Sequence, residues 1–151
     1  MKSSSDKSLI PKKSIMFLCT GNSCRSQMAE GWMRKFWASE FDVYSSGTHR
    51  HGMNERAVKV MLEAGVDISS HSSKTIEELP RATFDYVVTV CDSAKESCPY
   101  FSGGKLLHAS FQDPPALTKG MTNEEEILAV YRKVRDEIRD FVKDIDKVLE
   151  K

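Results

Sequence analysis

The eight residues from Cys19 to Ser26 constrain the fold of this chain more than any other stretch. They read Cys-Thr-Gly-Asn-Ser-Cys-Arg-Ser, follow a β-rich apolar run over 14–18, and precede a run whose apolar residues recur at helical spacing. A strand, a tight loop and a helix in this order form a concave anion site, because the loop N–H groups and the positive end of the helix dipole converge on one point. We therefore predict that this loop binds a tetrahedral oxyanion.

Side chains of the loop supply the chemistry. Arg25 has a planar guanidinium that can hold two oxygens of the anion. Cys19 lies at the bottom of the loop, where the same positive field favours a thiolate nucleophile. Ser26 is placed to donate its hydroxyl to that sulfur or to cap the helix. Gly21 is expected to supply a positive φ, which Asn22 also tolerates. A chance Cys-x5-Arg spacing is the alternative, but the strand, loop and helix signals agree.

Composition narrows the class of protein. The chain has 151 residues, with 22 Lys plus Arg and 22 Asp plus Glu, so it offers no basic surface for nucleic acid or membrane. We predict a disordered tail over 1–12 and a single domain over 13–151. No run is long enough to span a bilayer and the first residues lack the apolar segment of a signal peptide, which predicts a cytoplasmic protein. In that compartment the cysteines at 19, 24, 91 and 98 favour catalytic, redox or metal roles over structural disulfides.

Strand and helix patterns alternate along the chain. They predict an α/β fold, a doubly wound four-stranded parallel sheet flanked by helices. Strands are expected at 14–18, 41–46, 84–90 and 105–108, and helices at 26–39, between Asn54 and Gly65, at 76–79, and as one long amphipathic helix from Thr122 to Leu149. The third strand ends at Cys91, so Cys19 and Cys91 both lie at carboxyl ends of strands, the edge where open α/β sheets bind ligands.

With these features in place, the chain resembles the thioredoxin-coupled arsenate reductases, which share the fold of the low-molecular-weight protein tyrosine phosphatases. The matching stretches are residues 19–32, Val-Tyr-Ser-Ser-Gly at 43–47, Asp-Ile-Ser-Ser-His at 67–71, Val-Val-Thr-Val-Cys at 87–91 with Cys98 following, and Asp113-Pro114. A phosphatase needs only the loop cysteine, the arginine and a late acid. The further pair Cys91 and Cys98 therefore favours the reductase, as does Pro115-Ala116-Leu117 where the phosphatases carry tyrosines.

The resemblance implies a relay of three thiols. The Cys19 thiolate attacks arsenate while Asp113 protonates the leaving oxygen. Cys91 then attacks Cys19 and releases arsenite, and Cys98 attacks Cys91, leaving a disulfide that thioredoxin reduces. The implied substrate-binding residues are Thr20, Gly21, Asn22, Ser23, Cys24, Arg25 and Ser26. We expect a monomer with no bound redox cofactor, in which Cys24 carries no electrons.

Several positions depart from the family pattern or suit a purely structural role. Some family members hold a potassium ion with groups that match Asn22, Glu30, Ser45 and Ser72, together with an aspartate. Lys74 stands at the aspartate position, which should weaken such a site, and its ammonium can take the place of the ion. Gln112 replaces an acid before Asp113, which itself can serve only to shape a turn. His71 matches a family histidine and is expected to be structural.

Two alternatives belong to other functional classes. One is a phosphatase acting on phosphotyrosine or small phosphomonoesters, and the reductase itself can retain weak phosphatase activity. The other is a four-cysteine zinc module or an anion sensor, which is disfavoured because the cysteine spacings are unlike those of common zinc sites and Arg25 would repel the metal. His49 and His51 have a spacing that suits a metal but no third ligand, so we interpret them as solvated loop residues and predict no metal.

Overall fold

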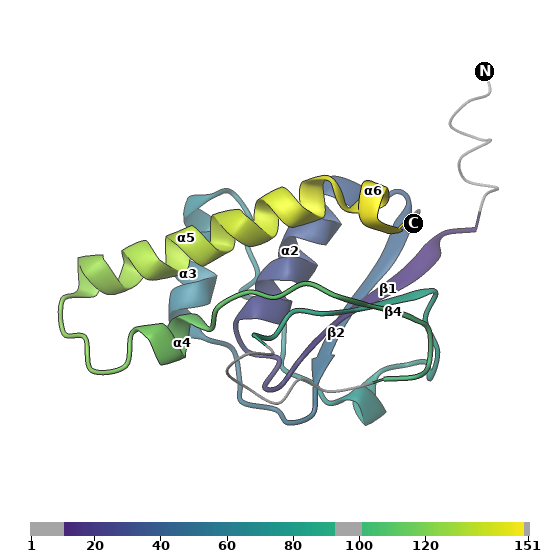
Figure 1. The fold of residues 1–151 in the computed structure, drawn as a ribbon, viewed down its shortest axis with the longest axis horizontal. Helices are drawn as coiled ribbons and strands as arrows, with labels where there is room; N and C mark the ends of the chain where they lie inside the picture. Colours follow the sequence, from purple (N-terminus) through teal and green to yellow (C-terminus); the bar gives the residue numbers. More distant parts are fainter. Residues whose placement is uncertain (1–10, 93–100, 150–151) are drawn as a thin grey trace, which may run out of the picture.

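A four-stranded parallel sheet forms the centre of the computed structural model, which describes residues 11–92 and 101–149. The strands are β1 (Lys13–Cys19), β2 (Phe41–Gly47), β3 (Tyr86–Thr89) and β4 (Lys105–His108), in the order β2-β1-β3-β4 (Figure 1). The predicted fold class is confirmed. β3 is shorter than predicted, and Asp85 directly before it binds Ser14 of β1 with its side chain. The predicted tail falls mainly on residues 1–10, outside the described ranges.

The helices follow the predicted segments with two differences. They are α2 (Arg25–Trp37), α3 (Glu55–Glu63), the 3-10 helix η1 (Ile76–Glu78), α4 (Pro114–Leu117), α5 (Glu124–Lys143) and α6 (Ile145–Leu149). The prediction of one long last helix is wrong, because the helix ends at Asp144 and a short one follows. The short helix α4 was not predicted; its two prolines occupy the first helical positions, where no N–H is needed.

Two apolar clusters cover the faces of the sheet. The larger contains Ile15 and Phe17 of β1 with residues of α2, α3 and α5, and α5 runs across α2 in Figure 1. Indole N–H groups fasten these two helices: Trp32 Nε1 donates to Arg135 O at 3.2 Å and Trp37 Nε1 to Val142 O at 2.9 Å. The smaller cluster lies on the other face and contains Met16, Leu18, Leu79, Phe84 and Val87. Because both faces are covered, the central strands β1 and β3 carry nearly continuous apolar runs.

The strand order determines which edge of the sheet carries the predicted site. The chain passes from β1 to β2 on one side and then returns to β3 on the other side of β1. The carboxyl ends of β1 and β3 therefore meet at a topological switch point, where loops diverge and leave a crevice. Cys19 ends β1, and Val90 N donates to Leu18 O at 3.0 Å, which extends the pairing to the residue before Cys91. Both predicted thiols thus follow neighbouring strands at one edge.

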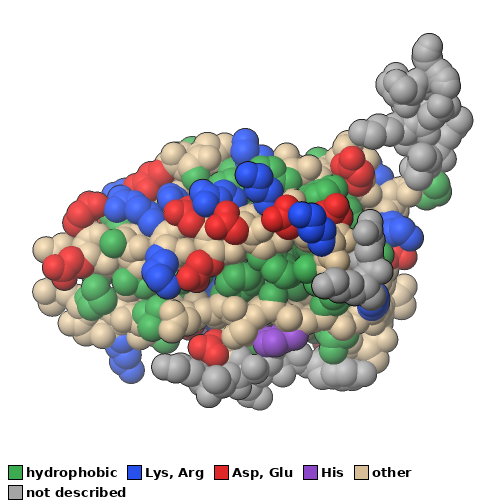
Figure 2. All heavy atoms as spheres, turned by 45° about the horizontal axis from the view of Figure 1, so that its top comes forward, with side chains coloured by type: hydrophobic (Ala, Val, Ile, Leu, Met, Phe, Trp, Pro, Cys, Tyr) green, Lys and Arg blue, Asp and Glu red, His purple; other side chains and the backbone are tan. Residues whose placement is uncertain are grey.

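The surface carries charges of both signs. Figure 2 shows acidic and basic side chains interspersed over one face of the molecule. For example, Arg132 Nε of α5 lies 2.8 Å from Glu63 Oε1 of α3, and Arg132 Nη1 lies 2.7 Å from Glu125 Oε2. Such mixed surfaces are solvated rather than selective for one charge. Among the described residues, no helix is long and apolar enough to cross a membrane.

Asp85 makes the stability of the sheet depend on pH. Its carboxylate accepts hydrogen bonds from Ser14 N at 2.7 Å and Ser14 Oγ at 3.2 Å, which lower the pKa of Asp85 below its ordinary value. A depressed pKa stabilises the fold at pH values above the unfolded-state pKa of about 4, and this stabilisation is lost as the pH falls. We expect the unfolding free energy of Asp85→Asn to fall less steeply below pH 4 than that of the wild type. Urea unfolding between pH 7 and 3 measures this slope.

A matched variant separates this effect from a general change in charge. Asp42 lies on β2 and is exposed, so Asp42→Asn should keep the acid dependence of the wild type. Equal slopes for Asp85→Asn and the wild type would show that the Ser14 hydrogen bonds do not control this titration.

Candidate oxyanion site

A cavity of about 510 Å³ opens at the predicted edge of the sheet. It is lined by three segments: the loop after β1, the segment before α3, and the start of α4. The lining residues are Cys19, Thr20, Gly21, Ser23, Cys24, Arg25, His51, Asn54, Asp113 and Pro115. The structure therefore brings together most of the predicted site. Asn22, Ser26 and Cys91 are not among the lining residues, and Cys98 lies outside the described residues.

The loop is held open by donors that bind its carbonyl oxygens from outside. Thr20 O accepts from His49 N (3.0 Å), Gly21 O from His51 N (3.1 Å), Asn22 O from Ser73 Oγ (2.5 Å) and Ser23 O from Asn54 N (3.2 Å). In a trans peptide the N–H points opposite to the C=O. Outward carbonyls therefore turn the loop N–H groups toward the cavity, where they can bind an anion.

Gly21 and Gly47 have no side chain and therefore allow neighbouring groups to pack closely at the loop; they do not curve the backbone through a positive φ. Gly21 does not have a positive φ, so that expectation is wrong; the left-handed residue is Asn22, with φ of 49°. A Cβ on Gly21 would lie only 2.9 Å from Cγ of His51, so the absence of a side chain makes room for the imidazole. A Cβ on Gly47 would lie 2.6 Å from Thr20 O, so β2 also reaches the loop through a glycine.

The sulfur of Cys19 lies at the buried end of the cavity. Cys19 is 3% exposed and its thiol donates to Ser26 Oγ at 3.1 Å. Asn22 Nδ2 also donates to Ser26 Oγ, at 2.9 Å. Because the serine oxygen accepts this N–H, its own proton is available to the sulfur once Cys19 ionises. Ser26 lies inside α2 rather than capping it, since the N-cap position is Cys24. The predicted contact of Ser26 with the Cys19 sulfur is therefore present in the structure.

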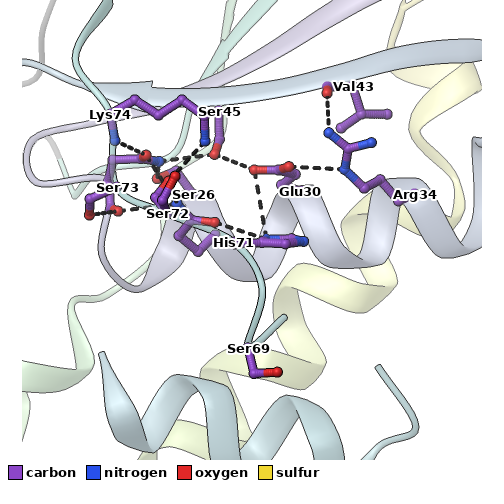
Figure 3. A network of polar contacts seen from close by, with 12 residues as sticks. Ser26, Glu30, Arg34, Val43, Ser45, Ser69, His71, Ser72, Ser73 and Lys74 are labelled. Carbon is purple, nitrogen blue, oxygen red and sulfur yellow. Dashed lines mark hydrogen bonds and ion pairs between the residues drawn. The ribbon is translucent and has the colours of Figure 1, made fainter. Parts of the chain in front are cut away.

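A buried chain of polar contacts extends from this serine to the surface of α2 (Figure 3). Asn22 Nδ2 donates to Ser45 Oγ at 3.0 Å, and Ser45 Oγ donates to Glu30 Oε1 at 2.5 Å. Arg34 Nε donates to the other Glu30 oxygen at 2.9 Å. The buried carboxylate thus has an ionic partner, and its orientation fixes the hydroxyl and amide groups that lead to the Ser26 oxygen.

His71 belongs to the same network. Gln27 Nε2 donates to Asn22 Oδ1 at 3.0 Å, which fixes the orientation of the Gln27 amide. Its Oε1 then accepts from His71 Nδ1 at 3.0 Å. Burial lowers the pKa of His71, and the nearby Glu30 only partly opposes this shift. These contacts agree with the expected structural role.

The residues at the predicted cation position do not fit a bound potassium ion. Ser72 O accepts from Lys74 Nζ at 2.8 Å and from Gln27 Nε2 at 3.1 Å, so this carbonyl already binds an ammonium and an amide. Lys74 N donates to Asn22 Oδ1 at 2.8 Å. Within 11–92 and 101–149, no group of three His, Cys, Asp or Glu residues is arranged to hold a metal ion. The groups that would bind the cation instead accept hydrogen bonds from side-chain and backbone donors of the protein itself.

Arg25 spans the cavity between the loop and the segment before α4. It is 4% exposed, and Nη1 donates to Phe111 O at 3.0 Å. Nη2 lies 3.6 Å from Asp113 Oδ1, and the Asp113 side chain is 34% exposed at the cavity. The guanidinium is therefore held with its charge at the cavity wall, beside the predicted acid.

The described cysteines differ in their state. Burial raises the pKa of the Cys24 thiol well above its ordinary value, and Asp113 adds to this rise, which favours the protonated, less reactive form of this thiol. Cys19 and Cys24 are free. Cys91 is fully buried and disulfide-bonded, and its partner is not among the described residues.

Three lining residues were not predicted as part of the site. Asn54 was predicted only as an N-cap, and it does accept from Arg56 N and Ala57 N. His51 was interpreted as a solvated loop residue, although its ring lines the cavity. Pro115 was noted only as a departure from the phosphatase pattern. The proximity of these residues to the loop is created by tertiary structure and leaves no local signal in the sequence.

Known proteins resemble this chain over most of its length. The family model for low molecular weight phosphotyrosine protein phosphatase matches residues 14–151. An arsenate reductase of Halalkalibacterium halodurans is 51% identical over 128 residues, which cover 84% of this chain and 90% of the relative.

Solved structures agree with this match. One described as an arsenate reductase in the phosphate binding state has a TM-score of 0.73 at 30% identity, covering 91% of this chain and 98% of the other. A low molecular weight protein tyrosine phosphatase from T. tengcongensis has a TM-score of 0.66 at 28% identity, covering 92% and 99%. This chain therefore belongs to the low molecular weight phosphotyrosine protein phosphatase family, and within it to the arsenate reductases.

Proposed function

We propose that this protein reduces arsenate to arsenite through Cys19, Cys91 and Cys98, and that thioredoxin restores the thiols. The observation that carries the proposal is a free cysteine at the base of an oxyanion cavity, next to the strand end that leads to a disulfide-bonded cysteine. The similarity to curated arsenate reductases supports the choice of substrate.

The first step uses the cavity residues. Arsenate is held by the N–H groups of residues 20–25 and by Arg25. The Cys19 thiolate, supported by the Ser26 hydroxyl, attacks arsenic and forms a sulfur–arsenic bond. Asp113 supplies the proton with which one oxygen leaves as water. Its position beside Arg25 at the cavity supports this role. Arsenic remains in the +5 state in this step.

The second step transfers two electrons. The Cys91 thiolate attacks the sulfur of Cys19, the sulfur–arsenic bond breaks with its electron pair going to arsenic, and arsenite leaves. The two sulfurs are oxidised to a Cys19–Cys91 disulfide. The pairing of Val90 with Leu18 supports this step, because adjacent strands lie about 4.8 Å apart and disulfides bridge similar separations.

The last steps regenerate the enzyme. The Cys98 thiolate attacks Cys91 and releases the Cys19 thiolate, which leaves a Cys91–Cys98 disulfide. A dithiol protein such as thioredoxin then reduces this bond by exchange and supplies the two electrons. The disulfide at Cys91 supports its participation in exchange. We propose that the cycle runs in a monomer in the cytoplasm, where such donors are kept reduced.

Cys98→Ser is expected to stop the enzyme after one turnover. Without the third thiol, the Cys19–Cys91 disulfide has no internal route to an exchangeable form. The measurement is arsenate-dependent NADPH oxidation with thioredoxin and thioredoxin reductase, together with arsenite released in a rapid-quench experiment. The variant should release no more than one arsenite per chain, whereas the wild type continues.

The competing function is phosphatase activity, which the shared fold favours as a second candidate. A phosphatase would hydrolyse a phenyl phosphate ester with equal multiple-turnover rates in the wild type and Cys98→Ser. If neither protein reduces arsenate while both hydrolyse the ester, the reductase proposal is wrong. A stoichiometric zinc content in the purified protein would instead support the zinc module.

A further inference from the structure

His51 is held against the oxyanion loop by contacts on both sides of it. Its backbone N donates to Gly21 O at 3.1 Å, and its neighbour His49 N donates to Thr20 O at 3.0 Å. Three residues later, Asn54 N donates to Ser23 O at 3.2 Å. The segment that carries the histidine therefore has a fixed position relative to the loop.

The imidazole ring itself forms part of the cavity wall. It packs so closely on Gly21 that a methyl group there would lie 2.9 Å from its Cγ and 3.2 Å from its Cβ. On its other side the His49 ring lies nearly parallel, with a centroid separation of 6.0 Å and an interplanar angle of 3°. His51 lines the cavity with Cys19 and Arg25, whereas His49 does not. Of these two stacked histidine rings, only that of His51 therefore lines the cavity.

The charges around this ring leave room for a second hydrogen-bond donor to an anion. The charged or titratable groups are Cys19, Cys24, Arg25 and Asp113 in the cavity, His49 beside the ring, and the ion pair of Arg50 with Glu78 at 3.2 Å. Among the described residues that line the cavity, Arg25 is the only permanent cation, and it already lies 3.6 Å from the Asp113 carboxylate. An imidazole carries an N–H donor, so the His51 ring can share the binding of an oxyanion with Arg25.

We propose that His51 is a substrate-contacting residue, whose ring N–H donates to an oxygen of the bound oxyanion and strengthens its binding. For the physiological substrate this rests on the proposed reduction of arsenate. The binding itself requires only the cavity, so inorganic phosphate serves as the probe.

The experiment is calorimetric titration of inorganic phosphate into the full chain at pH 6 and pH 8. We expect His51→Ala to weaken phosphate binding about tenfold, the effect of losing one donor to the anion. The ratio of variant to wild-type affinity is taken at each pH, so that the ionisation of phosphate itself cancels. His51→Gln, which keeps an N–H donor, should retain part of the affinity.

His49→Ala is the matched control, since this histidine lies in the same segment but outside the cavity. Its phosphate affinity should stay within about twofold of the wild type at both pH values. Equal effects of His49→Ala and His51→Ala, or no effect of either, would overturn the proposal. Circular dichroism of each variant shows whether it folds.

The outcomes also separate this inference from the proposed function. A loss of phosphate affinity in His51→Ala, in a protein that does not reduce arsenate, would support the role of His51 and refute the reductase. If the wild type reduces arsenate, His51→Ala should raise KM for arsenate at pH 6 with little change in kcat. Unchanged phosphate affinity in an active reductase would overturn only the role of His51.

Gly21→Ala gives a second, steric test. Its methyl group would displace the His51 ring, so it should weaken phosphate binding in the wild-type background. In the His51→Ala background the same substitution should cost clearly less, because the ring is no longer there to displace. Additive effects of the two substitutions would show that the ring does not rest on Gly21.

Discussion

Cys19→Ser is expected to reduce arsenate turnover by at least about 10⁴-fold, because a serine hydroxyl is a far weaker nucleophile and cannot form a disulfide. The loop should stay intact, since its carbonyl oxygens are bound by residues outside it. Phosphate affinity should therefore remain within a few-fold of the wild type. The coupled NADPH assay measures the first effect and calorimetry the second.

Cys24→Ser is the cysteine control for this result. Cys24 is a buried thiol of the same loop, its pKa is raised by burial, and the proposed relay does not use it. The variant should keep turnover within about tenfold of the wild type, as expected for a buried group that is not a nucleophile. A loss as large as that of Cys19→Ser would mean that Cys24 takes part in electron transfer and that the assigned order of thiols is wrong.

Asn22→Ala is expected to destabilise the protein by about 3 to 5 kcal/mol and to abolish phosphate binding. The Asn22 side chain is completely buried and makes four hydrogen bonds. It donates to Ser26 Oγ and Ser45 Oγ, and accepts from Gln27 Nε2 and Lys74 N. Removal of the Asn22 side chain leaves these partners without their hydrogen bonds to it, and alanine tolerates the positive φ poorly. Urea unfolding and phosphate titration provide the two measurements.

Asn123→Ala makes the same chemical change at an exposed position. Asn123 caps α5 by accepting from Glu126 N at 3.1 Å, and the loss of such a cap costs about 1 kcal/mol. Phosphate affinity should not change in this variant. Similar unfolding free energies for the two variants would show that the Asn22 network contributes no more than a surface cap.

Most of the fold was predictable because local and long-range signals agree. Apolar periodicity and end signals together mark the strands at 41–47 and 105–108 and the helix between Asn54 and Gly65. Asn54 caps α3, and Gly65 has φ of 87°. The break at Asp144 had no such signal. Buried Val142 and Ile145 keep helical spacing across it, and the local sequence contains neither glycine nor proline. The apolar pattern alone therefore predicts one helix.

The candidate site was predictable where chemistry is local and not where contacts are distant. Cys19 and Arg25 could be assigned from one loop, and Asp113 from the resemblance. The role of Gly21 could not be predicted from the sequence, because it depends on His51, which is distant in the sequence and packs on this glycine. Likewise, Asn22 lies in a loop that resembles a ligand cradle, yet its side chain is turned toward Ser45 and Lys74.

The hydrogen-bond donors outside the loop that bind its carbonyl oxygens also link oxyanion binding to the stability of the protein. These donors come from residues 49–54 and from Ser73, and they are in place only when the β2 connection and the segment before η1 are assembled. An unfolded chain therefore lacks the proposed oxyanion site, and an oxyanion that binds only the native state stabilises it by RT ln(1 + [L]/Kd). Under this proposal, we expect phosphate to slow proteolysis of the protein in the absence of arsenate.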